Sequence, residues 1–450
     1  MAQQKAIDIT GNNISNVNTP GYSRQRLNLS QAAPVRSDGG TLSTGVTAGR
    51  KVQRIQDQFI WAQINAETES LGRWQAQKDA LSKAELMFDE VTGYGLNNAM
   101  SNFWNSWQDL VNNPSGQVER RSLLNTSEML SMSFNKLSTD LQQVRTESDH
   151  NIKESLTDVN RLAAQIAEVN GKIANIEVNG FSANEYRDER DLLLRDLGEL
   201  IDIQSFEDSD GFMTVSTGGG KPLVERSISW ELTAVPNAGG MNDVMWMDSA
   251  GGTADITSRI EGGKLKGWIE ARDTAIPDYL NQLDALAQGI MSDVNTLHSA
   301  GFSLDGSTTG QAFFSGTDAS NMAVDAAIVA DVNLIAAAST AAGAPGDDTN
   351  AIDIANLRHG LNMAANTTTY DDYYNSLVSL VGADTRDAEL TKNHEESMMA
   401  HLENYREEIS GVSLDEEMVN LIKFQHAYAA AAKMISTADE LLSTTINMVR

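Results

Sequence analysis

Two stretches of the 450-residue sequence carry residue types that could bind phosphate or a metal ion. Gly218–Lys221 resembles a phosphate-binding loop, but that motif requires glycine where Val215 stands and serine or threonine where Pro222 stands. His394 opens a run similar to the H-E-x-x-H pattern of a zinc-binding helix, yet the next histidine, His401, comes three positions too late. We therefore interpret the first stretch as a turn and the second as a solvated helix face.

A third stretch, Arg187–Asp191 followed by Arg195 and Asp196, concentrates acidic and basic side chains in front of Leu192–Leu194. Such a cluster could hold catalytic acids and bases, but alternating charges before an apolar run favour a salt-bridged helix start. The sequence also lacks cysteine, which excludes disulfides, thiolate zinc sites, iron–sulfur clusters and cysteine nucleophiles. The sequence thus predicts no catalytic residue, no metal site and no cofactor, and we expect no enzyme.

The charge balance limits the possible partners. The formal net charge is −29, which argues against nucleic acid as the main ligand and against docking on anionic lipid. Residues 1–60 nevertheless carry seven bases and three acids, whereas residues 401–450 carry eight acids and four bases. No apolar run is long enough for a transmembrane helix, and residues 1–10 do not resemble a secretory signal. These features indicate a protein that binds other proteins, either in the cytoplasm or after export without a cleaved signal.

The C-terminal end has the clearest helical pattern. A 4-3 alternation of mostly apolar positions runs from Leu414 to Val449 over about five heptads, which is typical of a coiled coil. Ser413 and Glu416 form a capping box in front of it, and Gly411 separates it from a preceding helix. A seam of this length needs a partner helix, in the same chain or in another.

The elements that lie between the ends are mainly helical. Periodic apolar residues predict a helix over 100–111 and a very long one over about 117–178, with a slip of the 4-3 register between Val144 and Ile152. Short β-prone runs separated by glycine turns predict a small β-domain over 201–260. Helix resumes near Gly267, 301–350 is predicted to contain loops with short strands, and 350–410 is helical.

An asparagine-rich segment follows the first helix. Residues 12–25 read N-N-I-S-N-V-N-T-P-G-Y-S-R-Q, a polar helix end followed by a tight turn. This run resembles the N-terminal motif of the bacterial flagellar rod and hook axial protein family, and within it that of the hook-associated junction subunits. Residues 410–417, S-G-V-S-L-D-E-E, together with the leucine, phenylalanine, glutamine and tyrosine that follow, are similar to the C-terminal end of the same family. Intermediate blocks, such as Gly262–Leu265 and Ile276–Tyr279, occur in the family's order.

The resemblance implies a mainly α fold with a small β-domain, in which the N- and C-terminal regions form a long antiparallel coiled coil and the β-rich insertion points outward. We expect a terminal coiled-coil domain of residues 1–60 and 405–450, and a helical middle domain of 61–200 and 261–404. A small β-rich outer domain would comprise 201–260.

The resemblance also implies a structural subunit at the junction between flagellar hook and filament, polymerised as a helical ring layer. Its implied partners are further copies of itself, the hook protein, a second junction protein and a cytoplasmic export chaperone at the C-terminal helix. The subunit would be extracellular, exported without a cleaved signal peptide. The alternatives are another axial subunit or a cytoplasmic helical scaffold or signalling protein.

Two sets of residues are expected to form the assembly interface. The N-terminal set would position the arm that follows the first helix, and the C-terminal set would provide the packing surface. The N-terminal set is Asn12, Asn13, Ile14, Asn16, Asn18, Pro20, Gly21 and Tyr22. The C-terminal set is Leu414, Met418, Leu421, Phe424, Gln425, Tyr428, Ile435, Leu442 and Ile446.

Overall fold

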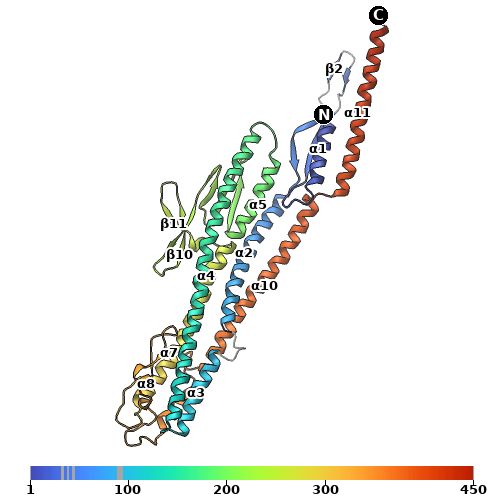
Figure 1. Cartoon of the computed structure of the whole chain (residues 1–450). Coiled ribbons are helices and arrows are strands. Elements are labelled where there is room, and N and C mark those ends of the chain that lie inside the picture. The colour runs from blue at the N-terminus through green and yellow to red at the C-terminus, as the bar shows by residue number, and fades with distance from the viewer. Residues whose placement is uncertain (1, 32–34, 38–39, 43–45, 89–94, 449–450) are drawn as a thin grey trace. The chain divides into compact units, whose positions relative to one another are not determined.

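The computed structural model describes residues 2–31, 35–37, 40–42, 46–88 and 95–448 and is mainly helical (Figure 1). The α-helices are α1 Ala2–Ser15, α2 Gln58–Met87, α3 Leu96–Asn112, α4 Gln117–Glu177, α5 Asn184–Leu200, α6 Gly263–Glu270, α7 Ile276–Ala300, α8 Ala326–Ala330, α9 Thr349–Asn356, α10 Tyr370–Ser410 and α11 Leu414–Met448. Short helical turns are η1 Thr257–Arg259, the π-helix η2 Ala271–Ala275, η3 Val332–Leu334 and η4 Leu357–His359. The strands are β1 Gln25–Gln31, β2 Val35–Ser37, β3 Gly40–Leu42, β4 Val46–Arg54, β5 Ile203–Glu207, β6 Met213–Thr217, β7 Pro222–Glu225, β8 Ile228–Ser229, β9 Leu232–Pro236, β10 Asn242–Met247, β11 Thr253–Asp255, β12 Phe314–Ser315 and β13 Ala323–Val324.

The chain forms two compact units, and each is described by itself. The first unit comprises Met1–Arg73, Lys153–Lys266 and Asn393–Arg450. The second comprises Trp74–Ile152 and Gly267–Lys392. The helices α2, α4 and α10 each contribute residues to both units.

The long helix over 117–178 is confirmed as α4, which runs without interruption for 61 residues. The register slip between Val144 and Ile152 does not break it, and both side chains are buried.

In the first unit, Asn160 and Asn170 on α4 fix the β-region. The amide of Asn160 exchanges two hydrogen bonds with the backbone of Leu232, and Asn170 accepts one from the backbone N–H of Met213.

The β-region over 203–255 confirms the small β-rich part that the sequence predicts. It consists of a four-stranded antiparallel sheet in the order β5-β6-β7-β8 and a three-stranded one in the order β11-β10-β9. Val215, Leu223 and Val244 are fully buried in it. This region belongs to the first unit.

The N-terminal part of the first unit contains strands that the sequence analysis did not predict. β1 and β4 pair antiparallel, with Gln25 opposite Arg54, and an irregularity lies between Leu27 and Leu29. The two leucines are half-buried and alternate with exposed polar residues, which is the period of a strand and not of a helix. The terminal segment is therefore a helix followed by a β-hairpin, and α1 packs against α11 in antiparallel orientation (Figure 1).

The second unit has a core of closely packed aromatic rings. Phe103, Trp104 and Trp107 on α3 are almost completely buried, as is Phe313 in the loop after α7. Ring centroids lie 4.7 Å apart between Phe103 and Trp104 and 5.3 Å apart between Trp107 and Phe313. The buried aromatic stripe of α3 thus packs against a ring from the loop after α7, at centroid distances typical of aromatic pairs.

His298 lies at the edge of this aromatic core with no solvent exposure. Its Nδ1 lies 2.7 Å from the carbonyl oxygen of Gln311, and its Nε2 accepts a hydrogen bond of 2.9 Å from the backbone N–H of Ala336. The second contact requires an unprotonated Nε2, so the proton is on Nδ1 and the ring is neutral. Burial lowers the pKa of His298 to about 4.

Candidate assembly site at the paired termini

The segment after α1 is a series of turns held by asparagine side chains. Asn16 donates from Nδ2 to the carbonyl oxygen of Asn12 at 3.0 Å, and the hydroxyl of Thr19 donates to Oδ1 of Asn16 at 3.1 Å. Asn18 and Pro20 are exposed. Asparagine side chains compete with the helical backbone in this way, which explains why α1 ends at Ser15.

Gly21 is the point at which this segment meets α5. Its φ of +77° lies in the left-handed region, and a Cβ placed there would come within 2.6 Å of the side chain of Leu192. A side chain at position 21 would therefore be strained and would also clash. The close approach requires glycine, as the sequence has it.

Asn13 is the centre of the site. Its side chain is 1% exposed, although it belongs to a surface helix. Oδ1 accepts hydrogen bonds from the hydroxyl of Tyr22 at 2.9 Å and from the backbone N–H of Gln25 at 3.0 Å. Nδ2 donates to the carbonyl oxygen of Gln25 at 2.9 Å and to Oε2 of Glu417 at 3.2 Å. One amide thus joins α1, the following turn, β1 and α11.

Glu417 and Arg24 form the charged part of the same network. Oε1 of Glu417 lies 2.7 Å from an Nη of Arg24, which also pairs with Glu416 at 2.8 Å. The Glu417 side chain is 3% exposed, whereas that of Glu416 is 62% exposed. A buried carboxylate is costly unless it is paired and hydrogen-bonded, and Arg24 and Asn13 together meet that requirement.

α5 contributes a second pair of buried acids. Arg54 at the end of β4 forms ion pairs with Asp188, at 3.1 Å from Nε to Oδ1, and with Asp191. Burial raises the pKa of Asp188 to about 6, although the charge of Arg54 opposes this shift. Burial, and then the negative charges of Asp188 and other nearby carboxylates, raises the pKa of Tyr22 to about 12. Tyr22 therefore stays protonated and remains a donor to Asn13.

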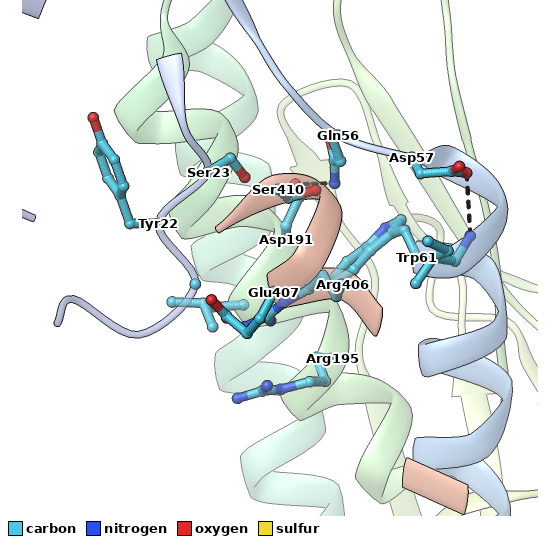
Figure 2. A pocket seen from close by; sticks show the side chains of 13 residues that line it. Tyr22, Ser23, Gln56, Asp57, Trp61, Asp191, Arg195, Arg406, Glu407 and Ser410 are labelled. Atoms are coloured by element: carbon cyan, nitrogen blue, oxygen red, sulfur yellow. Dashed lines mark hydrogen bonds and ion pairs between the residues drawn. The ribbon is translucent and has the colours of Figure 1, made fainter. Parts of the chain in front are cut away.

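A small cavity of about 30 Å³ lies beside these contacts. Figure 2 shows Gln56 and Asp191 at its wall, joined by a hydrogen bond of 3.0 Å from Nε2 to Oδ2, and shows the ring of Tyr22 turned away from it. Its volume is far below that of a cleft for an organic ligand. Among the described residues, no group of three or more histidine or acidic side chains could hold a metal ion.

The structure separates the predicted C-terminal residues into two groups. Leu421 and Phe424 are half-buried. The others are exposed, from 47% for Leu414 and Tyr428 to 65% for Ile435. The exposed members are Leu414, Met418, Gln425, Tyr428, Ile435, Leu442 and Ile446. Val449, the last residue of the predicted seam, lies outside the described residues.

α1 packs on a neighbouring face of α11, one residue out of step with the predicted seam. Glu417, Asn420 and Phe424 line a groove together with Ile9 and Thr10 of α1. These positions have the same 4-3 spacing as the predicted seam, because a helix can carry two such series side by side. Phe424 is the member of the predicted C-terminal set in this lining, and among the described residues no hydrogen bond or ion pair joins the predicted N-terminal set to the C-terminal set. Asn13 reaches α11 through Glu417, which belongs to neither set.

Several residues of this site are not among those that the sequence predicts. Glu417 and Arg24 stood inside the terminal motifs, but nothing in the sequence distinguishes a buried glutamate from the exposed one beside it. The sequence predicts that Asp188 and Asp191 belong to a salt-bridged helix start. They are indeed ion-paired, but with Arg54 of β4 and not within α5. The only hint of this pairing in the sequence is Arg54 itself, a basic residue at the end of β4.

Models of bacterial flagellar protein families match both ends of the chain and a large part between them. The model described as flagellar hook-associated protein FlgK helical domain matches residues 81–314. The C-terminal model of the flagellar basal body rod FlgEFG proteins matches residues 404–448, and the flagella basal body rod protein model matches residues 1–22.

Individual relatives are similar along almost the entire chain. Flagellar hook-associated protein 1 of Bacillus subtilis is 30% identical over 99% of this chain and 96% of its own length. Its counterpart in Escherichia coli is 26% identical over 99% and 97%, respectively. The solved structure of the flagellar hook junction protein FlgK from Burkholderia pseudomallei has the same fold, with a TM-score of 0.64 over 76% of this chain and all of that one, at 15% identity. The chain therefore belongs to the flagellar hook-associated protein FlgK family.

Membership of this family confirms the resemblance that the terminal motifs indicated. The protein is a structural component of the bacterial flagellum and assembles with other hook and flagellar components. None of the helices in the described part of the chain is long and apolar enough to cross a membrane.

Proposed function

We propose that the protein forms a ring layer at the junction between flagellar hook and filament, and that the exposed series on α11 is its main packing surface. The observation that supports this proposal is the uncovered apolar face of α11. Ile435 and Leu442 are 65% and 60% exposed, and they continue the 4-3 spacing of Met418 and Tyr428. Exposed apolar residues in such a row are typical of an interface that is covered on assembly.

The N-terminal set has a positioning role in this proposal. Asn13 and Tyr22 fix the turn that carries the chain from α1 into β1, while Gly21 allows its approach to Leu192. Residues 1–60 and 405–450 would act as the terminal domain, 61–200 and 261–404 as the middle domain, and 201–260 as the outer domain. The role is structural, without catalysis.

Further partners belong to the same proposal. The ring layer would contact the hook protein on one side and the second junction protein on the other. Before assembly, an export chaperone would cover α11, and the protein would leave the cell without a cleaved signal. The uncovered apolar face supports a chaperone, because such a surface on a free chain promotes aggregation. Recovery of the protein from sheared flagella tests its extracellular placement.

The packing surface is tested by placing charges on it. Leu421→Asp together with Ile435→Asp should abolish motility and junction formation, since each aspartate would be buried without a partner on assembly. Thr437→Asp together with Thr444→Asp adds the same charges on the opposite side of α11 and should leave motility unchanged. Swimming assays and electron microscopy of the hook–filament boundary are the measurements. Normal junctions in the first variant would contradict the proposed packing surface.

A further inference from the structure

Two glutamates meet where α2 and α10 pack against each other in the first unit. Glu67 of α2 is hydrogen-bonded to the side chain of Glu395 of α10, and both residues are half-buried. The hydroxyl of Ser70, one turn further along α2, donates to Oε1 of Glu395 at 2.9 Å. All three residues belong to the first unit. The two helices are thus joined by polar groups at this point.

The hydrogen bond between the two glutamates requires a proton. An ionised carboxylate can only accept hydrogen bonds, so one of the two groups must be protonated to donate to the other. Oε1 of Glu67 is shielded from solvent and receives no hydrogen bond from any described residue, whereas Glu395 receives one from Ser70. The proton therefore belongs on Glu67, and Glu395 is the ionised acceptor.

No basic side chain compensates the two acids. Among the described residues, neither Glu67 nor Glu395 forms an ion pair with a base. His394, beside Glu395, is exposed. The other titratable groups in the adjoining turns of α2, α5, α6 and α10 have partners of their own. They are Glu69 and Arg73 on α2, Arg195 and Glu199 on α5, Asp202 after α5, Lys264 on α6, and Lys392, Glu396 and Glu403 on α10.

The environment of Glu67 keeps its proton bound up to neutral pH. Burial first, and then the hydrogen bond and the negative charge of Glu395, raise the pKa of Glu67 from 4.5 to about 7. A group whose pKa is raised in the contact stabilises that contact fully below pH 4.5. This stabilisation falls as the pH rises from 4.5 to 7 and is lost above pH 7, where Glu67 is ionised in either state.

We propose that Glu67 and Glu395 form a proton-dependent contact between α2 and α10, which holds the two helices together while Glu67 is protonated and loosens when it ionises. Release of the proton removes the hydrogen bond and leaves two adjacent negative charges in a half-buried contact without a base. Local separation of the helices then brings both carboxylates into water. The first unit is therefore expected to loosen reversibly at this point in an alkaline medium.

A second glutamate of α2 titrates in the same range but takes no part in this contact. Oε1 of Glu69 accepts a hydrogen bond of 3.1 Å from the backbone N–H of Ile203, at the start of β5. Burial raises the pKa of Glu69 to about 7, although this hydrogen bond opposes the shift. Because its ionised form keeps its donor, Glu69 differs from Glu67. An experiment must still separate the two groups.

Amide hydrogen exchange of the full chain at pH 5.5 and 8.5 tests the contact. Glu67→Gln supplies a donor to Glu395 at every pH, because an amide does not titrate. The ratio of the exchange rate in the natural protein to that in this variant, taken at the same pH, cancels both the intrinsic pH dependence of exchange and the titration of Glu69. In peptides from 60–73 and 393–402 this ratio should rise about 30-fold between the two pH values, given a pKa of about 7 in the contact and 4.5 outside it. Peptides of α3 should show no rise.

Two further variants make the result decisive. Glu408→Gln, at an exposed glutamate of the same helix, is the matched control and should follow the natural protein at both pH values. Glu395→Gln provides an amide that can donate to ionised Glu67, so it should also remove the pH dependence, and it replaces Glu67→Gln if that variant does not fold.

The proposed contact is wrong if the ratio stays constant in both peptides, or if Glu408→Gln changes the pH dependence as much as Glu67→Gln does. The measurement uses the soluble protein and involves no flagellar assembly. A negative result would therefore leave the proposed function unaffected, and a failure of the proposed function would not touch this contact.

Discussion

The aromatic core of the second unit and the terminal region of the first differ in what covers their apolar side chains. Around Trp107, every large side chain is enclosed by residues of the same chain. On α11, the residues that the structure describes cover the base, whereas Ile435, Leu442 and Ile446 are more than half exposed. Burial of apolar surface stabilises the first region in the free protein. The exposed series of α11 has no such cover among the described residues.

The difference also appears in the polar groups. His298 in the second unit and Glu417 in the first are both buried, and each is satisfied within the chain. Glu417 fixes the base of α11 to α1, whereas no described residue fixes the distal half. Among the described residues, α11 is thus fixed at its base and exposed along its distal half.

The largest effect is expected in the aromatic core. Trp107→Ala should lower the free energy of unfolding by about 3–5 kcal/mol, because it removes a fully buried ring and leaves a cavity. Ile435→Ala is the matched control and should change it by less than about 0.5 kcal/mol in the free protein, since the side chain is exposed. Denaturant unfolding followed by circular dichroism measures both. Similar losses of unfolding free energy in the two variants would contradict the difference between the enclosed aromatic core and the exposed face of α11.

The second prediction concerns the pH dependence that His298 causes. Its pKa is about 4 in the folded protein and about 6.5 in an unfolded chain. Above pH 6.5 both states are neutral and the stability is fully present. As the pH falls towards 4, only the unfolded chain takes up the proton, so folding should lose on the order of 2–3 kcal/mol.

Unfolding measured at pH 7, 5.5 and 4.5 in the natural protein and in His298→Gln tests this dependence. The variant should be less stable at pH 7 but should lose less on acidification. His394→Gln, at an exposed histidine, is the control and should follow the natural protein. If the free energy of unfolding of His298→Gln falls with pH as steeply as that of the natural protein, groups other than His298 cause the loss of stability in acid.

The smallest effect is expected at the base of α11. Glu417→Ala should cost about 1–3 kcal/mol, because Asn13 and Arg24 lose their buried acceptor. The loss should be local and should appear as faster amide hydrogen exchange in α1, with little change in α3. Glu416→Ala removes the neighbouring, exposed partner of Arg24 and should cost much less. Equal exchange in both variants would mean that burial of Glu417 contributes nothing to the pairing.

The elements with a sustained period could be predicted from the sequence. α4 and α11 follow their apolar spacing almost to the residue, and so does the β-region after α5. The β1–β4 hairpin was missed because its strands are polar and only Leu27 and Leu29 mark the alternation. Its pairing depends on residues 25 and 54 meeting, which no local pattern specifies.

The site could be predicted only in part, because its contacts, like those of the hairpin, join residues that are far apart in the sequence. The sequence pattern pointed to the more apolar series of α11, whereas α1 packs on the series that begins with Glu417 and Asn420. Polar residues at an interface are invisible to a search for apolar spacing, because their partners come from elsewhere in the chain. The N-terminal motif predicts a role for Asn13, but no pattern in the sequence predicts its contact with Glu417.

The hydrogen bond between Asn13 and Glu417 joins residues that are 404 positions apart, and the turn before β1 also contacts Asp188, 165 positions from Ser23. Contacts at such separations close very large loops and form late in folding. The first 25 residues can reach their final conformation only when the last 40 are also available. The pairing of α1 with α11 is therefore expected to form last in folding. The aromatic core, whose segments are closer together in the chain, is expected to form before it.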